Sequence, residues 1–312
     1  MTKTLAVRLK APLYRLGCGE LMKQARTAAS RQGARLSFNG WQTRWVRDAK
    51  TLLLPAADAG MILSVCLLPT RALERFFLTP ADQLEVANLT GRTLRFKTAS
   101  GFTCESPTPP ESQNVHTGYY LKGGPRPGDI ALDGGAYIGE ITLELAVSVG
   151  PEGHVFAFEP DAANRAYLLR NIAASGLKNI TVIGQALWNK TTVLEFFHAQ
   201  GLGSTLTGMI TQDAGARTLR LPVLSPSDAF ARMGRLPNFI KLDIEGAEVE
   251  VIEAMLPLLA ETDVKIAIAS YHAREGRPTS ALLEPMLKAA GFTVETGFPE
   301  HQTTWAWREA AS

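Results

Sequence analysis

The sequence has few cysteines and no long hydrophobic run. Its 312 residues include three cysteines, Cys18, Cys66 and Cys104, with no C-x-x-C pair; this excludes a disulfide framework and a cysteine-based metal site. The longest apolar run, 61–68, is interrupted by Ser64 and is far shorter than the ~20 residues of a membrane span. No apolar segment follows the N-terminal basic residues, as a secretory signal would require. We therefore expect a cytoplasmic protein without a transmembrane segment.

An excess of charge of one sign is also missing, although the charges are unevenly distributed. The formal net charge is +2, which argues against a wholly basic nucleic-acid binder. Residues 1–50 hold eleven basic and two acidic residues, whereas the remaining 262 residues hold 21 basic and 28 acidic ones. The basic segment could contact an anionic membrane surface or a protein partner. Alternatively, it is a solvated helical face that docks on the acidic remainder of the chain.

Apolar segments and helical segments alternate from about residue 128 onward. Alternation of this kind is typical of a mostly parallel sheet covered on both faces. The connection 296–302 is too short for a parallel crossover, so the last two strands should be antiparallel. The expected strands are 130–132, 154–158, 180–183, 192–197, 218–223, 239–242, 264–269, 292–295 and 303–308, and the expected helices are 138–149, 162–175 (with Gly176 as its C-cap), 247–259 and 280–290.

The N-terminal part is less regular. Leu5, Leu9, Leu13 and Leu16 recur at helical spacing. Short strands are expected at 38–45, 51–54 and 93–96. The Pro-rich stretch 106–111 is typical of a linker. We predict an N-terminal accessory and substrate-specificity region, 1–110, and a second domain, 111–312.

A glycine-rich loop, Asp133-Gly-Gly-Ala-Tyr-Ile-Gly139, lies between a predicted strand and a predicted helix. Glycines allow the backbone to approach a ligand closely, and a helix N-terminus favours an anionic group. Ala136 stands where the middle glycine of a dinucleotide fingerprint would be. The acid at the strand end suits a ligand with a cationic amine and a carboxylate, such as the methionine part of S-adenosylmethionine. An ordinary tight turn would also be rich in glycine.

Two further acidic segments follow strands. Glu159 ends the next strand and could accept both ribose hydroxyls of a nucleoside, although a helix-capping role is the alternative. In Ile240-Lys-Leu-Asp-Ile-Glu-Gly-Ala-Glu248, Asp243 and Glu245 should face the ligand cleft, whereas Glu248 suits a helix N-terminus. Carboxylates can bind Mg²⁺, but no further ligand set is apparent, so we predict no metal.

Together these motifs resemble the FkbM family of S-adenosylmethionine-dependent methyltransferases. The resemblance covers about residues 111–295 and includes Gly203-Ser-Thr205, while Gly134 and Trp188 depart from the family pattern. It implies a class I, Rossmann-like fold: a seven-stranded, mostly parallel sheet with an antiparallel C-terminal strand pair, here preceded by a smaller N-terminal α+β region. It also implies S-adenosylmethionine as cofactor and O-methylation of a sugar, polyketide or other small-molecule or glycan acceptor. The predicted cofactor-binding residues are Asp133, Gly135, Ala136, Tyr137, Gly139, Glu159, Pro160, Ala186 and Asp243.

Methylation of an alcohol also removes a proton, so a base near the acceptor would help. His272 is the first candidate because it follows the 264–269 strand and should reach the same sheet edge; Asp243 is the competitor, and Glu245 is the third predicted catalytic residue. Ser204, Thr205 and Tyr120 are candidates for the acceptor pocket.

Two other functions fit the same pattern. One is a nicotinamide-dependent oxidoreductase on a related sheet, which Ala136 disfavours. The other is a non-catalytic cofactor-binding module whose basic arm, 1–50, holds a membrane or a partner.

Overall fold

The chain divides into two compact units, Met1–Gln113 and Asn114–Ser312, each described by itself. The structure is a computed structural model. It describes residues 19–38, 42–47, 50–55, 62, 66–67, 86–88, 93–107, 118–198, 205–206, 217–274, 276–298 and 301–308. Within these residues, no helix has the length and apolar character that crossing a membrane requires.

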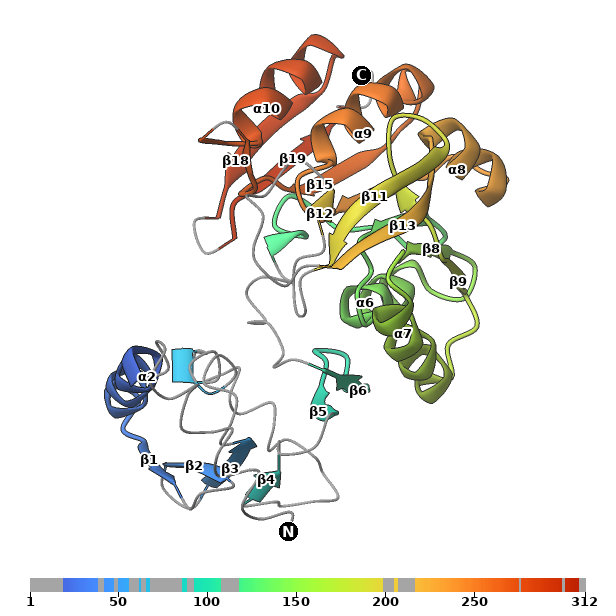
Figure 1. The fold of residues 1–312 in the computed structure, drawn as a ribbon. Coiled ribbons are helices and arrows are strands. Elements are labelled where there is room, and N and C mark those ends of the chain that lie inside the picture. Colours follow the sequence, from blue (N-terminus) through green and yellow to red (C-terminus); the bar gives the residue numbers. More distant parts are fainter. Residues whose placement is uncertain are drawn as a thin grey trace. The chain divides into compact units, whose positions relative to one another are not determined.

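The second unit is built on a seven-stranded sheet (Figure 1). Its strands are β7 (Ile130–Gly134), β8 (His154–Phe158), β9 (Ile180–Ile183), β14 (Phe239–Leu242), β15 (Lys265–Ala269), β18 (Thr293–Gly297) and β19 (Thr303–Trp307). Their order is β18-β19-β15-β14-β7-β8-β9. Neighbouring strands are parallel from β15 to β9, whereas β19 pairs antiparallel with both β15 and β18. The predicted architecture is confirmed.

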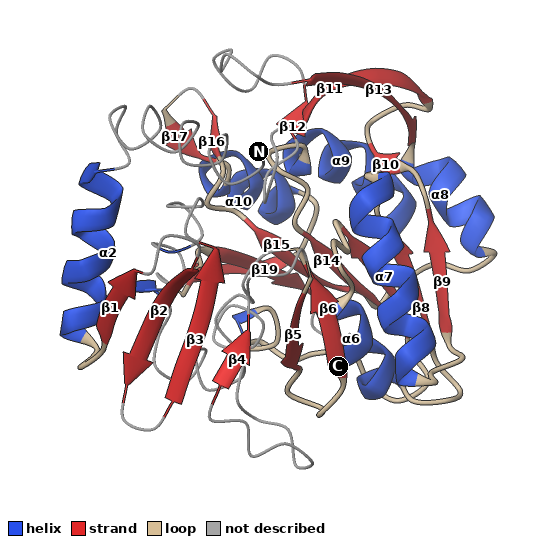
Figure 2. Cartoon of the chain, turned by 60° about the horizontal axis from the view of Figure 1, so that its bottom comes forward, coloured by secondary structure: helices blue, strands red, loops and turns tan. Residues whose placement is uncertain are grey.

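Helices cover both faces of this sheet (Figure 2). They are α6 (Glu140–Val149), α7 (Ala162–Ser175), α8 (Pro226–Met233), α9 (Glu248–Met255) and α10 (Ser280–Ala289). Because side chains alternate along a strand, Leu132 and Ile268 pack with α8, α9 and α10. Ala131 and Val155 face the opposite side, where α6 packs on them, and Ala157 on that side contacts Leu168 of α7. The parallel strands are therefore mostly apolar, as strands buried on both faces are.

Two glycines and one proline determine where helices begin and end. Gly139 has φ 91° and is the N-cap of α6, so this helix begins two residues later than predicted. Gly176 has φ 76° and is the C-cap of α7, as predicted. Pro257 lies in the 3₁₀ turn Leu256–Leu259, which ends the segment that was predicted to be α-helical through 259; proline lacks the N–H that the helix would need there.

The predicted strands 192–197 and 218–223 belong to a separate small sheet. Its members are β10 (Ala186–Leu187), β11 (Thr192–His198), β12 (Thr205–Leu206) and β13 (Arg217–Leu224), in the order β10-β13-β11-β12. Strands β11 and β13 are antiparallel, in agreement with their alternating sequence. A short hairpin, β16 (Ala273–Arg274) and β17 (Arg277–Pro278), follows β15.

The described residues of the first unit include the helix α2 and two sheets. These elements are α2 (Gly19–Arg31), β1 (Arg35–Phe38), β2 (Gln42–Arg47), β3 (Lys50–Pro55), β4 (Val86–Asn88), β5 (Leu94–Lys97) and β6 (Thr103–Ser106). The prediction of one strand over 38–45 was wrong, because the chain forms the antiparallel pair β1 and β2 there. Helix α2 was not predicted; its buried face consists mainly of small residues such as Ala25, Ala28 and Ala29, which give a weak hydrophobic period. The predicted Leu5–Leu16 helix lies outside the described residues.

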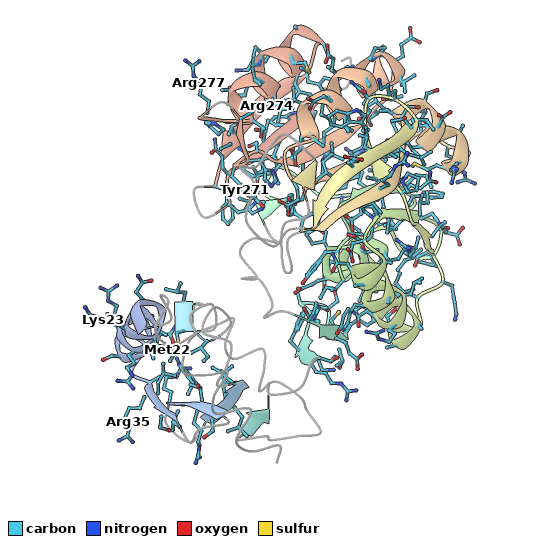
Figure 3. The ribbon with its side chains drawn as sticks, viewed as in Figure 1. Met22, Lys23, Arg35, Tyr271, Arg274 and Arg277 are labelled. Atoms are coloured by element: carbon cyan, nitrogen blue, oxygen red, sulfur yellow. The ribbon has the colours of Figure 1, made fainter. Side chains whose placement is uncertain are left out.

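Basic side chains lie on the outer side of this unit. Lys23 and Arg35 are exposed, and Figure 3 shows both pointing away from the elements that carry them, whereas Met22 is buried.

Candidate active site

The glycine-rich loop connects β7 with α6 at the carboxyl edge of the sheet. Gly135 and Gly139 have φ 76° and 91°, and Tyr137 between them has φ 50°. A Cβ atom on Gly135 would lie 1.8 Å from the carbonyl oxygen of Asp243. Glycine therefore lets this loop pack directly on the segment after β14. Helix α6 has no side-chain hydrogen bond at its N-cap, so its first N–H groups are oriented to receive an anionic group.

A buried ion pair fixes the loop from below. Asp133 and Lys241 are neighbours across β7 and β14, their charged atoms are 3.0 Å apart, and both side chains are almost fully buried. The Nζ of Lys241 donates to the carbonyl oxygens of Gly134 and Gly135 at 3.2 and 2.8 Å. Thr142 donates to Asp133 at 2.6 Å. Asp133 thus lies beneath the loop and holds Lys241, which in turn holds the loop backbone.

Glu159, at the end of β8, is buried beside the same loop. Its two carboxylate oxygens accept hydrogen bonds from the backbone N–H groups of Tyr137 and Asp161, both at 2.8 Å. Burial raises the pKa of Glu159 to about 7, against the opposing effect of these two hydrogen bonds. Each oxygen retains a second lone pair. The carboxylate is therefore held in a fixed orientation and can still accept hydroxyl groups.

Asp243 follows β14 and lies at the centre of a polar cluster. Tyr119 donates a hydrogen bond to its Oδ2 at 2.9 Å, and the hydroxyl of Tyr271 is 3.5 Å from its Oδ1. Burial by itself would raise the pKa of Asp243. The neighbouring His301, Lys241 and His272 outweigh burial and hold this pKa well below its usual range. Asp243 is consequently a firmly ionised group.

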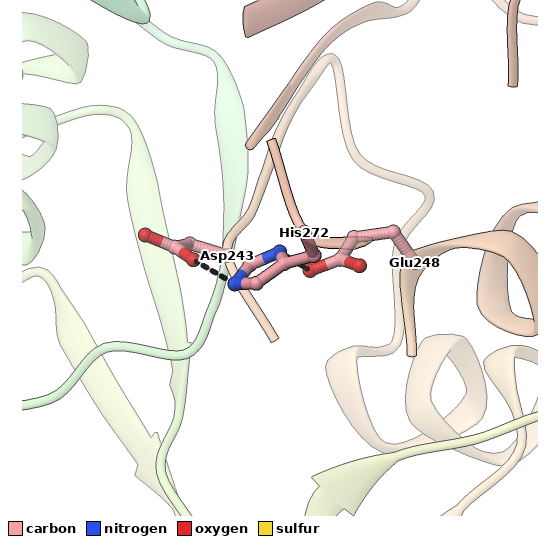
Figure 4. A group of neighbouring side chains, drawn as sticks. All are labelled: Asp243, Glu248 and His272. Atoms are coloured by element: carbon pink, nitrogen blue, oxygen red, sulfur yellow. Dashed lines mark ion pairs between the residues drawn. The ribbon is translucent and has the colours of Figure 1, made fainter. Parts of the chain in front are cut away.

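The His272 imidazole lies between two carboxylates (Figure 4). Its Nδ1 is 3.1 Å from Oε1 of Glu248, and its Nε2 is 3.8 Å from Oδ1 of Asp243. The Nε2 atom is also 3.5 Å from Oε2 of Glu245. Burial would lower the pKa of His272, but Glu245, Glu248 and Asp243 outweigh it and raise this pKa to about 10.

Glu248 is not only a residue of a helix N-terminus. Its side chain is fully buried, and its Oε1 accepts hydrogen bonds from the backbone N–H groups of Ile244 and Gly246. Glu245, within this loop, has φ 58°, a conformation that is costly for a non-glycine residue. The loop thus fixes Glu248 directly beneath His272.

The same residues raise the question of a metal. One ligand atom each from Asp243, Glu248 and His272 lies within 4.8 Å of the others. However, the ring presents a different nitrogen to each carboxylate, and Figure 4 shows it between them. This is the arrangement of an imidazolium between two carboxylates rather than of three donors around one ion. The absence of a metal stays a prediction.

The predicted acceptor residues have different positions. Tyr120 packs on Phe239, with ring centroids 6.1 Å apart, and it is Tyr119 that reaches Asp243. Ser204 lies outside the described residues, and of Thr205 only its place in β12 is described. Among the other predicted cofactor residues, Ala136 contacts Ala157 and Leu168 in the core, while Ala186 is half-buried in β10. The carbonyl oxygen of Pro160 accepts a hydrogen bond from Arg165.

Sequence reasoning missed Lys241 and His301 as members of the site, and it selected Tyr120, whereas Tyr119 is the tyrosine that reaches Asp243. His301 follows β18, and its Nε2 is 3.3 Å from the Tyr119 hydroxyl. Nothing in its sequence context places it at the sheet edge. Lys241 did carry a signal, because a lysine inside an otherwise apolar strand must find a buried partner.

The strand order and the loops at its carboxyl edge define a class I, Rossmann-like methyltransferase fold. The model of the FkbM methyltransferase domain matches residues 133–294. The chain belongs to this family, and membership implies S-adenosylmethionine as the cofactor.

Solved structures of methyltransferases are similar to the chain at low identity. FkbM methyltransferase from Methylobacillus flagellatus KT has 22% identity and a TM-score of 0.40, covering 57% of this chain and 43% of that one. Precorrin-6y C5,15-methyltransferase from Geobacter metallireducens GS-15 has 14% identity and a TM-score of 0.42, covering 64% and 89%. An S-adenosylmethionine-dependent methyltransferase from Aquifex aeolicus has 17% identity and a TM-score of 0.35, covering 58% and 82%. The comparison with curated proteins gave no match.

Proposed function

We propose that the protein transfers a methyl group from S-adenosylmethionine to a hydroxyl group of a small-molecule or glycan acceptor. The observation that carries this proposal is the convergence of the glycine loop, Glu159 and Asp243 at one edge of the sheet, in a chain of the FkbM family. The nicotinamide alternative finds no support in that family match. The choice of oxygen, rather than nitrogen or carbon, rests on the resemblance to the family.

The chemistry of the residues present fits this cofactor. The N-terminus of α6, which has no side-chain hydrogen bond at its N-cap, suits the carboxylate of a methionine moiety. The fixed carboxylate of Glu159 suits two ribose hydroxyls. Asp243, Glu245 and Glu248 outnumber the single imidazole between them, so the end of the site beyond β14 attracts a cation.

The cofactor supplies an electrophilic methyl group on a sulfonium. When the cofactor is bound, the acceptor oxygen would form a bond to this methyl group while the carbon–sulfur bond broke and its electron pair stayed on sulfur. The protein contributes by aligning the acceptor and excluding water. It must also take the hydroxyl proton.

We assign this proton to Nε2 of His272 rather than to Asp243. Asp243 has a lowered pKa and accepts a hydrogen bond from Tyr119 already, so it is a weak base. The Nε2 atom lies on the side of the partly exposed Glu245, whereas Nδ1 faces the buried Glu248. Asp243 and Glu245 then orient the imidazole and the acceptor.

Calorimetry with S-adenosylhomocysteine tests cofactor binding. We expect saturable binding well below 1 mM, a concentration that corresponds to only about 4 kcal/mol. Absence of binding at that concentration would refute the proposal. Incubation with ¹³C-methyl-labelled cofactor and a mixture of candidate acceptors, followed by ¹³C NMR, distinguishes an O-methyl product from N- or C-methyl products. A protein that binds but transfers nothing to any acceptor class would favour the non-catalytic module.

A further inference from the structure

The protonation state of His272 depends on the carboxylates around it and on whether another cation lies near them. Charged or titratable groups face it from several elements. Asp243 and Glu245 come from the segment after β14, Glu248 comes from α9, and the Tyr271 ring, 4.3 Å away, comes from its own segment. Without another cation, these carboxylates need the imidazole to be protonated.

Other groups contact Asp243 on the side away from His272. Tyr119 and His301 contact its Oδ2, at 2.9 and 3.9 Å, while Lys241 is committed to Asp133 and the glycine loop. Oδ2 is therefore engaged on the side away from His272, and Oδ1 faces the imidazole. The carboxylates around His272 retain a net negative charge even when the imidazole is cationic, and a second cation can enter beside it.

We propose that His272 is an imidazolium in the cofactor-free protein and releases the proton from Nε2 when the cationic cofactor binds, so that the catalytic base is generated only in the loaded site. This inference rests on the proposed function, since it assigns a charge state to the base named there. Glu248 is a positioning residue in this scheme: it retains the proton on Nδ1, and the Ile244 and Gly246 N–H groups fix its own carboxylate. The N–H bond at Nε2 breaks before transfer, the proton goes to solvent, and Nε2 later accepts the acceptor's proton.

The pKa of about 10 is consistent with this charge state at neutral pH. A sulfonium near Asp243 and Glu245 would replace the imidazolium as the compensating charge and lower this pKa. S-Adenosylhomocysteine has a neutral thioether in the same place, so it should lower the pKa far less. The two ligands share the ribose, the adenine and the amino acid group, and they differ in the positive charge on sulfur.

Proton release on binding tests the proposal without any turnover. We would titrate the 312-residue protein with S-adenosylmethionine and with S-adenosylhomocysteine at pH 8.5, in buffers of different ionisation enthalpy, and derive the protons released per site. At this pH Glu159 is already ionised and contributes little to either titration. In the wild type we expect S-adenosylmethionine to release roughly half a proton or more beyond the number for S-adenosylhomocysteine. In His272→Gln this excess should disappear while both ligands still bind.

Other outcomes separate this inference from the proposed function. Equal proton release by both ligands in the wild type, or an excess that persists in His272→Gln, would overturn the inference and leave cofactor binding intact. Failure of both ligands to bind would instead overturn the proposed function. If His272→Gln does not fold, Glu245→Gln at a partly exposed position is the second variant: it removes one carboxylate beside Nε2 and should reduce the excess, and an unchanged excess would contradict the proposal.

Discussion

At the scale of single residues, the neighbouring groups decide what a buried acidic group can do. Glu159 and Asp243 are both carboxylates at strand ends, yet the pKa of Glu159 is raised and that of Asp243 is lowered. The difference arises because Glu159 has mainly backbone N–H groups around it, whereas Asp243 has cationic and hydroxyl groups. The same residue type therefore serves as a titrating acceptor in one place and as a permanent anion in the other.

The raised pKa of Glu159 gives a prediction about cofactor affinity. Only the ionised carboxylate can accept both ribose hydroxyls, so affinity for S-adenosylhomocysteine should increase as the pH rises from 6 to 8 through the pKa of about 7. In Glu159→Gln we expect affinity at pH 8 to fall about tenfold, the loss of roughly 1.4 kcal/mol, and its dependence on pH to be much weaker. Calorimetry at several pH values measures both effects. Identical pH profiles for the two proteins would remove Glu159 from the ribose site.

The same shift bears on stability. The folded state holds the Glu159 proton more tightly than the unfolded state, because the folded pKa of about 7 exceeds the usual 4.5. This tighter proton binding stabilises the folded state at low pH, and the stabilisation is lost as the pH rises from 4.5 to about 7. For His272, with a pKa raised from 6.5 to about 10, the stabilising contribution is complete below pH 6.5 and is lost as the pH rises through 10.

At the scale of elements, the site depends on how closely the loops after β7 and β14 approach each other. The N–H of Asp243 donates to the carbonyl oxygen of Gly134 at 3.0 Å, and Gly135 packs on the Asp243 carbonyl group. Lys241 of β14 also binds the first of these loops, through the carbonyl oxygens of Gly134 and Gly135. Removing one charge of the Lys241–Asp133 pair would leave the other buried and unpaired, which is strongly destabilising.

Gly135→Ala tests this close approach against a matched glycine. Gly135 and Gly176 both have φ +76°, but a Cβ on Gly176 meets nothing within 4 Å, whereas one on Gly135 would lie 1.8 Å from the Asp243 carbonyl oxygen. We expect Gly176→Ala to cost about 1 kcal/mol, for the backbone conformation alone. Gly135→Ala should cost about 3 kcal/mol or more and weaken S-adenosylhomocysteine binding. Chemical denaturation and calorimetry measure these effects, and equal losses in the two variants would show that the loops can separate without cost.

At the scale of the whole molecule, the chain combines a methyltransferase unit with an N-terminal unit of different character. Every residue of the cluster around Asp243 lies within Asn114–Ser312. The first unit presents exposed basic residues such as Lys23 and Arg35. We propose that residues 1–110 determine acceptor choice, and that the basic residues within 1–50 contact a membrane surface or a protein partner.

This division predicts the behaviour of a truncated protein. A fragment comprising residues 114–312, checked for folding by circular dichroism, should bind S-adenosylhomocysteine about as well as the full chain does, because the cluster around Asp243 lies within it. We expect the two affinities to differ by no more than about threefold, which is less than about 0.7 kcal/mol. It should lose transfer to acceptors that the full chain methylates. Removing residues 1–50 alone should abolish co-sedimentation with anionic vesicles if they contact a membrane. A fragment that retains full transfer activity would contradict the assignment of specificity to the first unit.

The sequence by itself determined the methyltransferase sheet. Its apolar strands, the glycine loop and the acidic strand ends are local patterns, and local patterns identify strands, turns and their order. The short connection 296–302 was enough to predict the antiparallel pair. The single strand predicted over 38–45 was wrong because these residues contribute to two antiparallel strands, β1 and β2.

Only the tertiary structure decided how the acidic residues are used. Lys241 meets Asp133 because β14 and β7 are adjacent in the sheet although more than a hundred residues separate them in the chain. Tyr119 and His301 both contact Asp243, although they lie near opposite ends of the sequence of the second unit. Glu248 is the first residue of α9, as expected, and its carboxylate also lies 3.1 Å from Nδ1 of His272. Charges act through space over a few ångströms, so the properties of these groups depend on neighbours that no local pattern specifies.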